Sequence, residues 1–293
     1  MIFGDSGMFY DFRKTKQKEI LPVLSTTQTD TLAITKRTLD FPELVLQILK
    51  NQKSKSEIEI NTYNTNKEIL LFCEKAKEYC EKITITTDCV KHNNFTEMKK
   101  LKDIGICVGA KFNHSKAVII RNAENNILIS SSFTFKKNLT TTQAIFISRD
   151  EKYFTDKNYF DIRNLQIQNL LKLATEQTRE IVILSFALSN HAGYLSLIKK
   201  RLPNTEIKVI HDKYYCKHSI KTLYGLRKSG VKLYYDINHI KAVYLDNGDN
   251  GKVLFLTSAN IGNNFRIEDI TKIENQDDIN SFMGAIWKTA KEY

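Results

Sequence analysis

Two short segments of the sequence repeat the same pair of reactive side chains. His114 and Lys116 stand in NHSKAVII, and His239 and Lys241 stand in NHIKAVYLD. Each segment predicts an apolar strand, where residues i and i+2 project from one face, so each His and its Lys would share a surface. A lysine ammonium can hold phosphate oxygens, and imidazole, with an unperturbed pKa near 6.5, can attack phosphorus or carry a proton. The pattern predicts a site that handles phosphate esters.

The duplication strengthens a signal that would be weak alone. A single His-x-Lys in a strand is most often a partly satisfied surface pair. Here each pair is followed by a polar break and a second apolar strand that ends in small hydroxyl or amide residues, in NNILISSSFTF and in GKVLFLTSANIGNN. Such side chains at a strand end can donate hydrogen bonds to a phosphoryl group.

The elements that must position these pairs are also duplicated. Alternating and helical hydrophobic periods predict the order strand, helix, strand, helix over residues 57–105 and again over 180–230, with the first helix spanning 66–80. Gly105 and Gly230 each end the last helix, and each stands 9 residues before the histidine of its copy. We therefore predict two α/β repeats.

The boundary between the repeats falls near residues 150–163. A predicted helix precedes each copy, at 41–51 and at 164–177, and the boundary segment lacks a Gly or Pro run. Two halves that pack together are therefore expected instead of two beads on a flexible linker. We divide the chain into an N-terminal extension at 1–27, a first repeat at 28–150 and a second repeat at 151–293.

With these motifs the sequence resembles the phospholipase D superfamily, whose signature is His-x-Lys-x4-Asp followed by Gly-Ser-x-Asn. His239, Lys241 and Asp246 have that spacing, and the run from Thr257 to Asn260, which includes Ser258, matches Gly-Ser-x-Asn with Thr for Gly. Glu268 stands where the family often has a carboxylate that holds the catalytic histidine. The sequence looks most like the phage and mobile-element branch of phospholipase D-like proteins.

The first half departs from the family pattern. It keeps the histidine and the lysine, but Arg121 occupies the aspartate position and Gln143 stands near the position of the downstream carboxylate. Its counterpart of Gly-Ser-x-Asn is SSSFT, in which Ser131 or Ser132 supplies the hydroxyl and phenylalanine or threonine replaces asparagine. This half has lost its acids, and its motif is degenerate.

The resemblance implies a fold and a mechanism. The fold is α/β, with two phospholipase D-like repeats, each a mixed β-sheet flanked by helices, packed about a pseudo-two-fold axis to build one active site. The family uses no metal and no other cofactor. One histidine attacks phosphorus to give a phosphohistidine, and the other protonates the leaving oxygen and then activates water.

Carried over to this sequence, the resemblance assigns a role to each motif residue. We expect His239 to be the nucleophile, because Glu268 could orient its ring and raise its basicity. His114 would then be the general acid, with Gln143 instead of a carboxylate behind it. Lysines, hydroxyls and an amide would bind the phosphoryl oxygens, namely Lys116, Lys241, Ser258 and Asn260, with Ser131, Ser132 and Gln143 contributing from the first half.

The charge indicates the class of substrate. The 293 residues include 44 Lys and Arg against 33 Asp and Glu, a net charge of +11. Such an excess fits a polyanionic partner such as nucleic acid, although a Lys-rich solvated surface is an equal alternative. Lys213, Tyr214 and Tyr215 combine a cation with aromatic rings, as in proteins that hold single-stranded nucleic acid by stacking. Half-buried strand residues are the simpler alternative for such aromatic runs.

Hydrophobic runs and the spacing of cysteines and histidines bear on the compartment of the protein and on metal binding. The N-terminus lacks the apolar run of a signal peptide and no stretch of 18 apolar residues occurs, which predicts a cytoplasmic protein with no membrane partner. The five cysteines form no C-x-x-C pair, which argues against a disulfide framework or a zinc ribbon. His211 and His218 have no standard zinc spacing, and we expect them in a loop near the groove.

Three functions remain open on the sequence. The leading hypothesis is a metal-independent phosphodiesterase, most simply a nuclease that cleaves DNA, with RNA as a less favoured substrate, acting as a monomer with an internal pseudo-dimer. The first alternative is a catalytically degenerate nucleic-acid-binding or assembly protein on the same fold. A phospholipase is a weaker alternative, because such enzymes usually carry a secretion signal, membrane segments or a docking helix.

Overall fold

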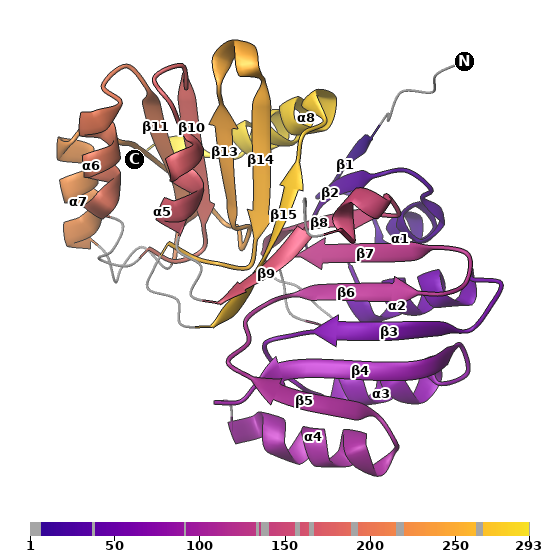
Figure 1. Cartoon of the computed structure of the whole chain (residues 1–293). Helices are drawn as coiled ribbons and strands as arrows, with labels where there is room; N and C mark the ends of the chain where they lie inside the picture. The colour runs from indigo at the N-terminus through magenta and orange to yellow at the C-terminus, as the bar shows by residue number, and fades with distance from the viewer. Residues whose placement is uncertain are drawn as a thin grey trace, which may run out of the picture.

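Two mixed β-sheets of eight strands each form the body of the molecule (Figure 1). The computed structural model describes residues 7–36, 39–90, 92–132, 135, 141–155, 159–163, 167–188, 193–214, 220–261 and 266–292. Helices α1–α4 flank the first sheet and α5–α7 flank the second (Figure 1). Among the described residues, no helix is long and apolar enough to cross a membrane.

The strands of the two sheets and the helices have the following bounds. The first sheet contains β1 (Met8–Phe12), β2 (Thr31–Lys36), β3 (Ser56–Asn61), β4 (Cys80–Asp88), β5 (Cys107–Lys111), β6 (Ala117–Arg121), β7 (Asn126–Ser131) and β8 (Thr142–Ser148). The second contains β9 (Tyr159–Arg163), β10 (Glu180–Ser185), β11 (Glu206–Asp212), β12 (Lys232–Asp236), β13 (Ala242–Asp246), β14 (Lys252–Thr257), β15 (Ile267–Ile273) and β16 (Lys291–Glu292). The α-helices are α1 (Gln17–Thr26), α2 (Phe41–Lys50), α3 (Lys67–Ala76), α4 (His92–Asp103), α5 (Ile167–Leu170), α6 (Tyr194–Arg201), α7 (Ile220–Lys228) and α8 (Gln276–Trp287).

The two sheets repeat one topology. The order β5-β4-β3-β6-β7-β8-β2 in the first sheet matches β12-β11-β10-β13-β14-β15-β9 in the second, strand for strand. The register matches as well, because Glu57 lies opposite Arg121 in the first half as Glu180 lies opposite Asp246 in the second. The sequence prediction of two α/β repeats is confirmed.

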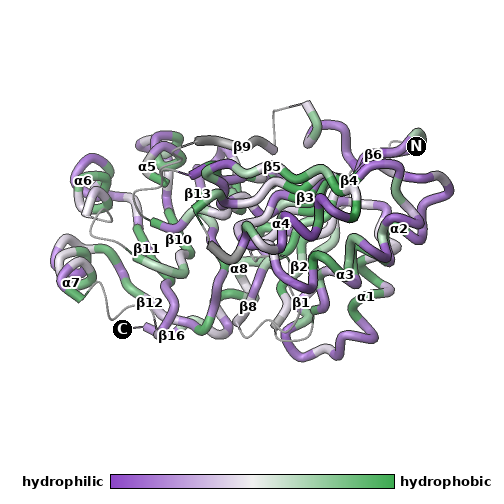
Figure 2. The backbone as a smooth tube through the Cα atoms, turned by 90° about the horizontal axis from the view of Figure 1, so that it is seen from below, coloured by the Kyte–Doolittle hydropathy of each residue, from purple (hydrophilic) through white to green (hydrophobic). Residues whose placement is uncertain are grey.

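Each central strand is buried on both faces, which produces three apolar layers. In β6, Val118 and Ile120 face the cluster beneath α1–α4, whereas Ala117 and Ile119 face a cluster shared with the second sheet. A third cluster fills the space between the second sheet and α5–α7. In Figure 2 the flanking helices mix hydrophilic and hydrophobic colours, as expected for elements with one face on a core.

Both ends of the described chain tie the halves together. The segment predicted as an N-terminal extension adds β1 to the first sheet, parallel to β2, and packs α1 against α2. Helix α8 packs against β1 and β2 of the first sheet and against β14 of the second. Its Phe282 meets Phe9 edge to face, with ring centroids 6.4 Å apart.

Two local predictions differ from the structure. The helix predicted over 66–80 ends at Ala76, and Cys80 begins β4 instead. The His-x-Lys pairs lie just before their strands, because β6 begins at Ala117 and β13 at Ala242. Asn113 and Asn238, which precede these strands, form backbone bridges with the other half of the molecule. A local hydrophobic pattern cannot indicate contacts of this kind.

The glycine that ends α7 yields a stability prediction with an internal control. Gly230 has a φ of +84°, a left-handed conformation that costs an L side chain about 1–2 kcal/mol, whereas Gly225 lies inside the exposed helix with nothing near its missing Cβ. We expect Gly230→Ala to lower the free energy of unfolding by about 1 kcal/mol and Gly225→Ala to raise it by about 0.5–1 kcal/mol. Urea unfolding of both variants measures this, and effects of the same sign would contradict it.

Candidate active site

Backbone bonds to the second half hold the histidine of the first half. Asn113 forms an isolated parallel bridge with Ile267, and the His114 N–H donates to the Ile267 carbonyl at 2.8 Å. The next residue of the second half is Glu268, whose Oε2 lies 2.8 Å from Nδ1 of His114. The side chain of Glu268 is 2% exposed, so this carboxylate is committed to the site.

The same arrangement recurs with the halves exchanged. Asn238 bridges Thr142, and the His239 N–H donates to the Thr142 carbonyl at 2.8 Å. Nδ1 of His239 lies 2.8 Å from the carbonyl oxygen of Ser132. Each histidine is therefore positioned by the opposite half, as a pseudo-two-fold axis through the site requires.

The expectation that Glu268 orients His239 is wrong. Glu268 contacts His114, although it lies in the same half as His239. The parallel bridge between Asn113 and Ile267 explains this pairing, because it places the next residue of each segment, His114 and Glu268, side by side. The assignment of His239 as nucleophile rested on that contact and loses its support.

Gln143 occupies the position equivalent to Glu268. Ser258 Oγ donates to Glu268, and Ser132 Oγ lies 3.0 Å from Oε1 of Gln143 in the same manner. The Gln143 amide donates to Thr141 Oγ1 at 2.6 Å. At this position the second half supplies a carboxylate where the first half supplies a neutral amide.

Two buried lysines lie beside the histidines. Nζ of Lys116 donates to the His114 carbonyl at 2.8 Å and lies 3.3 Å from both ring nitrogens. Nζ of Lys241 donates to the His239 carbonyl at 2.9 Å and lies 3.1 Å from Nδ1 of that ring. Burial lowers the pKa of both ammonium groups, and the charge of Lys116 lowers that of Lys241 further. The two positive charges thus act on one another across the interface.

Burial and these charges keep both imidazoles neutral. The pKa of His114 is lowered to about 4 by burial and by Lys116, against the opposing effect of Glu268. The pKa of His239 is lowered to about 2 by burial and by Lys241 and Lys116. Because each Nδ1 faces an oxygen acceptor, we assign the proton to Nδ1, which leaves a lone pair on Nε2 of each ring. An unprotonated Nε2 is the form of histidine that attacks phosphorus.

An aromatic ring packs against each histidine at equivalent positions. The ring of Tyr63, which follows β3, lies 4.9 Å from that of His114, and the ring of Phe186, which follows β10, lies 4.3 Å from that of His239. Nζ of Lys241 lies 5.5 Å from the Phe186 ring centroid. Sequence reasoning missed both aromatics, although each ends the first strand of its copy.

Asp269 is a second buried group that the sequence did not single out. Its Oδ1 accepts the Lys116 N–H at 2.8 Å, and its Oδ2 accepts the Ser130 hydroxyl at 3.2 Å. Burial raises the pKa of this carboxyl, against the opposing effect of Lys116. Ala144 stands at the equivalent position of the first half, next to Gln143. The second half thus contributes two adjacent acids, of which one contacts His114 and one contacts the backbone of Lys116.

Asp246 lies away from the two histidines, so the catalytic role that the motif implied for it is corrected. It ends β13, five residues after Lys241, which corresponds to about 16 Å along a strand. Its Oδ1 accepts the Gly248 N–H at 2.9 Å and shapes the turn that follows. Arg121, at the equivalent end of β6, lies 3.7 Å from Glu59. The change from aspartate to arginine in the first half therefore removes no group from the site.

The remaining predicted residues lie around the site. Ser131 Oγ donates to the Lys116 carbonyl at 3.1 Å, and Asn260 Oδ1 accepts the Ala187 N–H at 3.2 Å beside the Phe186 ring. Lys213 and Tyr214 follow β11 at the end of the second sheet that carries the site, and Tyr214 is 61% exposed. Tyr215, Cys216 and His218 lie outside the described residues.

His211 lies in β11 and not in a loop as expected. It is buried, and its Nδ1 lies 3.0 Å from the Asp212 carbonyl. Burial lowers its pKa. Within the described part of the chain, no group of three or more His, Cys, Asp or Glu side chains could hold a metal ion.

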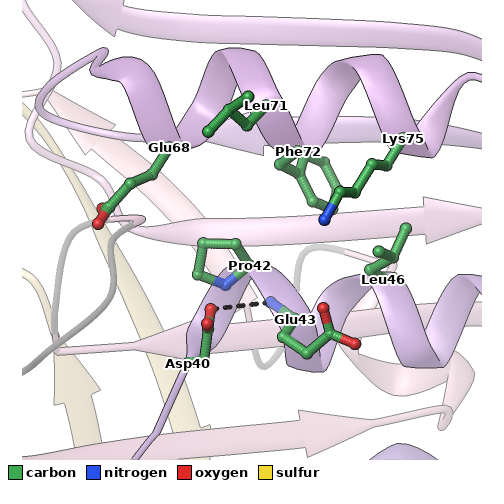
Figure 3. Close-up of a pocket in the computed structure, with 8 residues that line it drawn as sticks. All are labelled: Asp40, Pro42, Glu43, Leu46, Glu68, Leu71, Phe72 and Lys75. Atoms are coloured by element: carbon green, nitrogen blue, oxygen red, sulfur yellow. Dashed lines mark hydrogen bonds between the residues drawn. The ribbon is translucent and has the colours of Figure 1, made fainter.

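A hollow between α2 and α3 lies apart from these groups (Figure 3). Residues of α2 and its N-cap line one side, namely Asp40, Pro42, Glu43 and Leu46. Residues of α3 line the other side, namely Glu68, Leu71, Phe72 and Lys75. Both helices belong to the outer layer of the first half (Figure 1), whereas the histidines lie where the halves meet. The hollow therefore takes no part in the chemistry described above.

Solved structures share this architecture. No family model matches the sequence, and no curated protein matches it. Polyphosphate kinase from Porphyromonas gingivalis superposes with a TM-score of 0.69 at 14% identity, over 90% of this chain and 48% of that chain. Phosphatidylserine synthase from Haemophilus influenzae superposes with a TM-score of 0.62 at 8% identity, over 95% of this chain and 92% of that chain. Yeast tyrosyl-DNA phosphodiesterase superposes with a TM-score of 0.50 at 11% identity, over 84% of this chain and 90% of that chain.

These three proteins belong to the phospholipase D superfamily, and the chain has the fold of that superfamily. The resemblance noted in the sequence is thus confirmed at the level of the fold. The chain spans about half the length of the polyphosphate kinase chain.

The depressed histidine pKa values yield a prediction on acid stability. A histidine with a folded pKa of about 2 or 4 binds a proton on unfolding at any pH between that value and about 6.5, so stability falls as the pH falls through this range. Each histidine contributes about 1.4 kcal/mol per pH unit. We expect His239→Asn to reduce the slope of unfolding free energy against pH between pH 5 and 6 by about this amount. Urea unfolding measures it, and equal slopes would exclude a neutral, buried His239.

Proposed function

We propose that this chain is a metal-independent phosphodiesterase that cleaves nucleic acid, with DNA preferred over RNA. The observation that carries the proposal is the pairing of the two His-Lys segments by reciprocal bonds between the halves, through His114 to Ile267 and through His239 to Thr142. Two imidazoles with unprotonated Nε2 atoms and two buried ammonium groups then share one site. These groups are sufficient for attack, charge stabilisation and proton transfer at a phosphodiester.

The contact with Glu268 supports His114 as the nucleophile. The carboxylate orients the ring through Nδ1–H and stabilises the positive charge that the imidazole gains when Nε2 bonds to phosphorus. His239 donates Nδ1–H to a neutral carbonyl instead, so its protonated form is less stabilised and is the stronger acid. An acid that readily gives up its proton suits protonation of the leaving oxygen. This reverses the roles that the sequence alone suggested.

The proposed reaction proceeds in two displacements. Nε2 of His114 forms a bond to phosphorus while the bond from phosphorus to the leaving oxygen breaks, and His239, protonated on Nε2, gives that oxygen a proton. Water then gives a proton to Nε2 of His239 and attacks phosphorus, and the bond to His114 breaks. Both histidines return to their starting states.

The lysines supply the charge that binds the ester and favours the transition state. Lys116 and Lys241 are buried, with Glu268 and Asp269 as the acids whose charges act on both. A phosphodiester anion between them would relieve their mutual repulsion and restore their ordinary protonation. The same anion would raise the pKa of His239 and let it take up the proton that it later donates.

Two observations favour nucleic acid as the substrate. The net charge of +11 fits a polyanion, and the exposed Tyr214 with its neighbour Lys213 offers stacking and phosphate contacts near the second-half end of the site. Among the solved proteins of this fold, one is named a tyrosyl-DNA phosphodiesterase. The replacement of a carboxylate by Gln143 supports the alternative of a protein that binds nucleic acid without cleaving it.

Cleavage assays test the proposed function. We expect the wild-type chain to cleave DNA in the presence of EDTA, and His114→Asn or His239→Asn to reduce the rate by at least about 10³-fold, because each removes a group needed in both displacements. Asp246→Asn and Arg121→Gln serve as matched controls at the far ends of β13 and β6 and should retain activity. Binding without cleavage across a broad pH range would establish the binding-only alternative, and loss of activity in EDTA would contradict the mechanism.

The direction of the reaction is tested with an activated ester. Bis(p-nitrophenyl) phosphate has a leaving group that needs no proton, so His239→Asn should release about one equivalent of p-nitrophenolate and then stall with the phosphoryl group on His114. His114→Asn should release no such burst. Mass spectrometry of the stalled protein identifies the modified residue, and a burst in His114→Asn alone would reverse the two roles.

A further inference from the structure

A cluster of an arginine, a carboxylate and an aromatic ring lies beside the first-half histidine and takes no part in the mechanism above. Nε of Arg266 donates to Oδ2 of Asp88 at 2.8 Å, and the guanidinium carbon lies 5.4 Å from the ring centroid of Tyr63. The same Tyr63 ring lies 4.9 Å from the ring of His114. The guanidinium therefore lies within about 10 Å of the reacting imidazole.

This cluster is held rigidly by buried polar contacts. The Asp88 side chain is 0% exposed, and its second oxygen accepts the Val90 N–H at 2.9 Å. Asn94, which is 1% exposed, donates to the carbonyls of Asp88 and Tyr63 and accepts the N–H of Thr65. The segments that follow β3 and β4 are thus fixed to the start of α4. Arg266 is 22% exposed on this support, so it presents an oriented cation at the surface of the site.

The cluster distinguishes the two sides of the site. The bridge between Thr142 and Asn238 is equivalent to that between Ile267 and Asn113, so the residue equivalent to Arg266 is Thr141. Thr141 accepts a hydrogen bond from Gln143 and carries no charge. Phe186 is the equivalent of Tyr63. The first-half side therefore combines a cation with a phenol ring where the second-half side combines a hydroxyl with a phenyl ring.

A further aromatic residue is bonded through its backbone next to this cluster. The carbonyl of Phe112 accepts the N–H of Ile267 at 2.6 Å, which places Phe112 beside the residue that follows Arg266. Phe112 is 43% exposed, a large fraction for a phenyl ring two residues before His114. An exposed ring and an oriented guanidinium on neighbouring segments are the kinds of group that hold a base and its phosphate.

We propose that Arg266, Tyr63 and Phe112 form a second binding subsite, which takes a phosphate and a base of single-stranded nucleic acid next to the scissile phosphodiester. The proposal deepens the proposed function and rests on it for the position of the scissile group. Each strand of a duplex carries one phosphate about every 3.4 Å of axis and a single strand can be more extended, so a cation within about 10 Å meets a phosphate one to three nucleotides away.

The chemistry of the cluster selects this ligand over a phospholipid or a duplex. The contact between Nε of Arg266 and Asp88 fixes the plane of the guanidinium, a group whose geometry matches phosphate oxygens. Stacking on Phe112 requires a base with an accessible face, which a single strand offers and an intact duplex does not. A lone phosphodiester without a neighbouring nucleotide would reach the lysines but would gain nothing from Arg266.

Matched arginine variants test the subsite by activity. Arg266→Gln is compared with Arg121→Gln, which removes the same charge at the far end of β6, on a single-stranded DNA 12-mer and on bis(p-nitrophenyl) phosphate. We expect Arg266→Gln to lower the ratio of kcat/KM for the 12-mer to that for the small ester by about 10- to 100-fold, and Arg121→Gln to leave that ratio within about twofold. An unchanged ratio in Arg266→Gln, or an equal fall in both variants, overturns the subsite.

Binding tests the subsite independently of catalysis. In fluorescence anisotropy with the labelled 12-mer, Arg266→Gln should raise the Kd at least about 10-fold and reduce the slope of log K against log salt by about 0.7, the value for one phosphate contact on a single strand. Phe112→Leu should weaken the single strand more than a duplex of the same sequence. Equal losses for both forms would overturn the stacking role. A wild-type chain that hydrolyses neither substrate refutes the proposed function, while these Kd values still decide the subsite.

Discussion

The site depends on hydrogen bonds that each half of the molecule donates to the other. Each histidine directs its backbone N–H and its Nδ1 to the other half, His114 to Ile267 and Glu268 and His239 to Thr142 and Ser132. The apolar cluster between the sheets and the packing of α8 across them hold these contacts in register. The reactive groups are therefore brought together only where the two halves are in contact.

Burying two ammonium groups and two imidazoles at one interface carries a large electrostatic cost, and the cluster is arranged to offset it. The two acids of β15, Glu268 and Asp269, supply as much negative charge as the lysines supply positive charge. The imidazoles remain neutral at neutral pH, because burial and the lysines lower the pKa of both. The charges of these four side chains are thus nearly balanced, and an anion that binds between the lysines changes the protonation that each group prefers.

The sequence predicted the repeated architecture because repetition is visible along the chain, in strand and helix periods and in the fixed interval from Gly105 and Gly230 to the following histidines. It identified the reactive pairs by their residue types. It failed where a position depends on the partner half. Glu268 was matched to the histidine of its own half, Asp269 was overlooked, and Asp246 was taken as reactive because the motif carries spacing along the strand but not distance from the site.

The difference between Glu268 and its neutral counterpart Gln143 has a consequence for how a substrate must enter. In a perfectly symmetric site either ring could serve either purpose, and an ester could dock in two orientations of equal energy. Because only His114 has a carboxylate at its Nδ1, the two docking orientations of an ester differ in energy, and one of them is favoured. A polymer with distinguishable ends would then bind across the two histidines in one sense only, and duplication within one chain is what permits the two sides of the site to diverge.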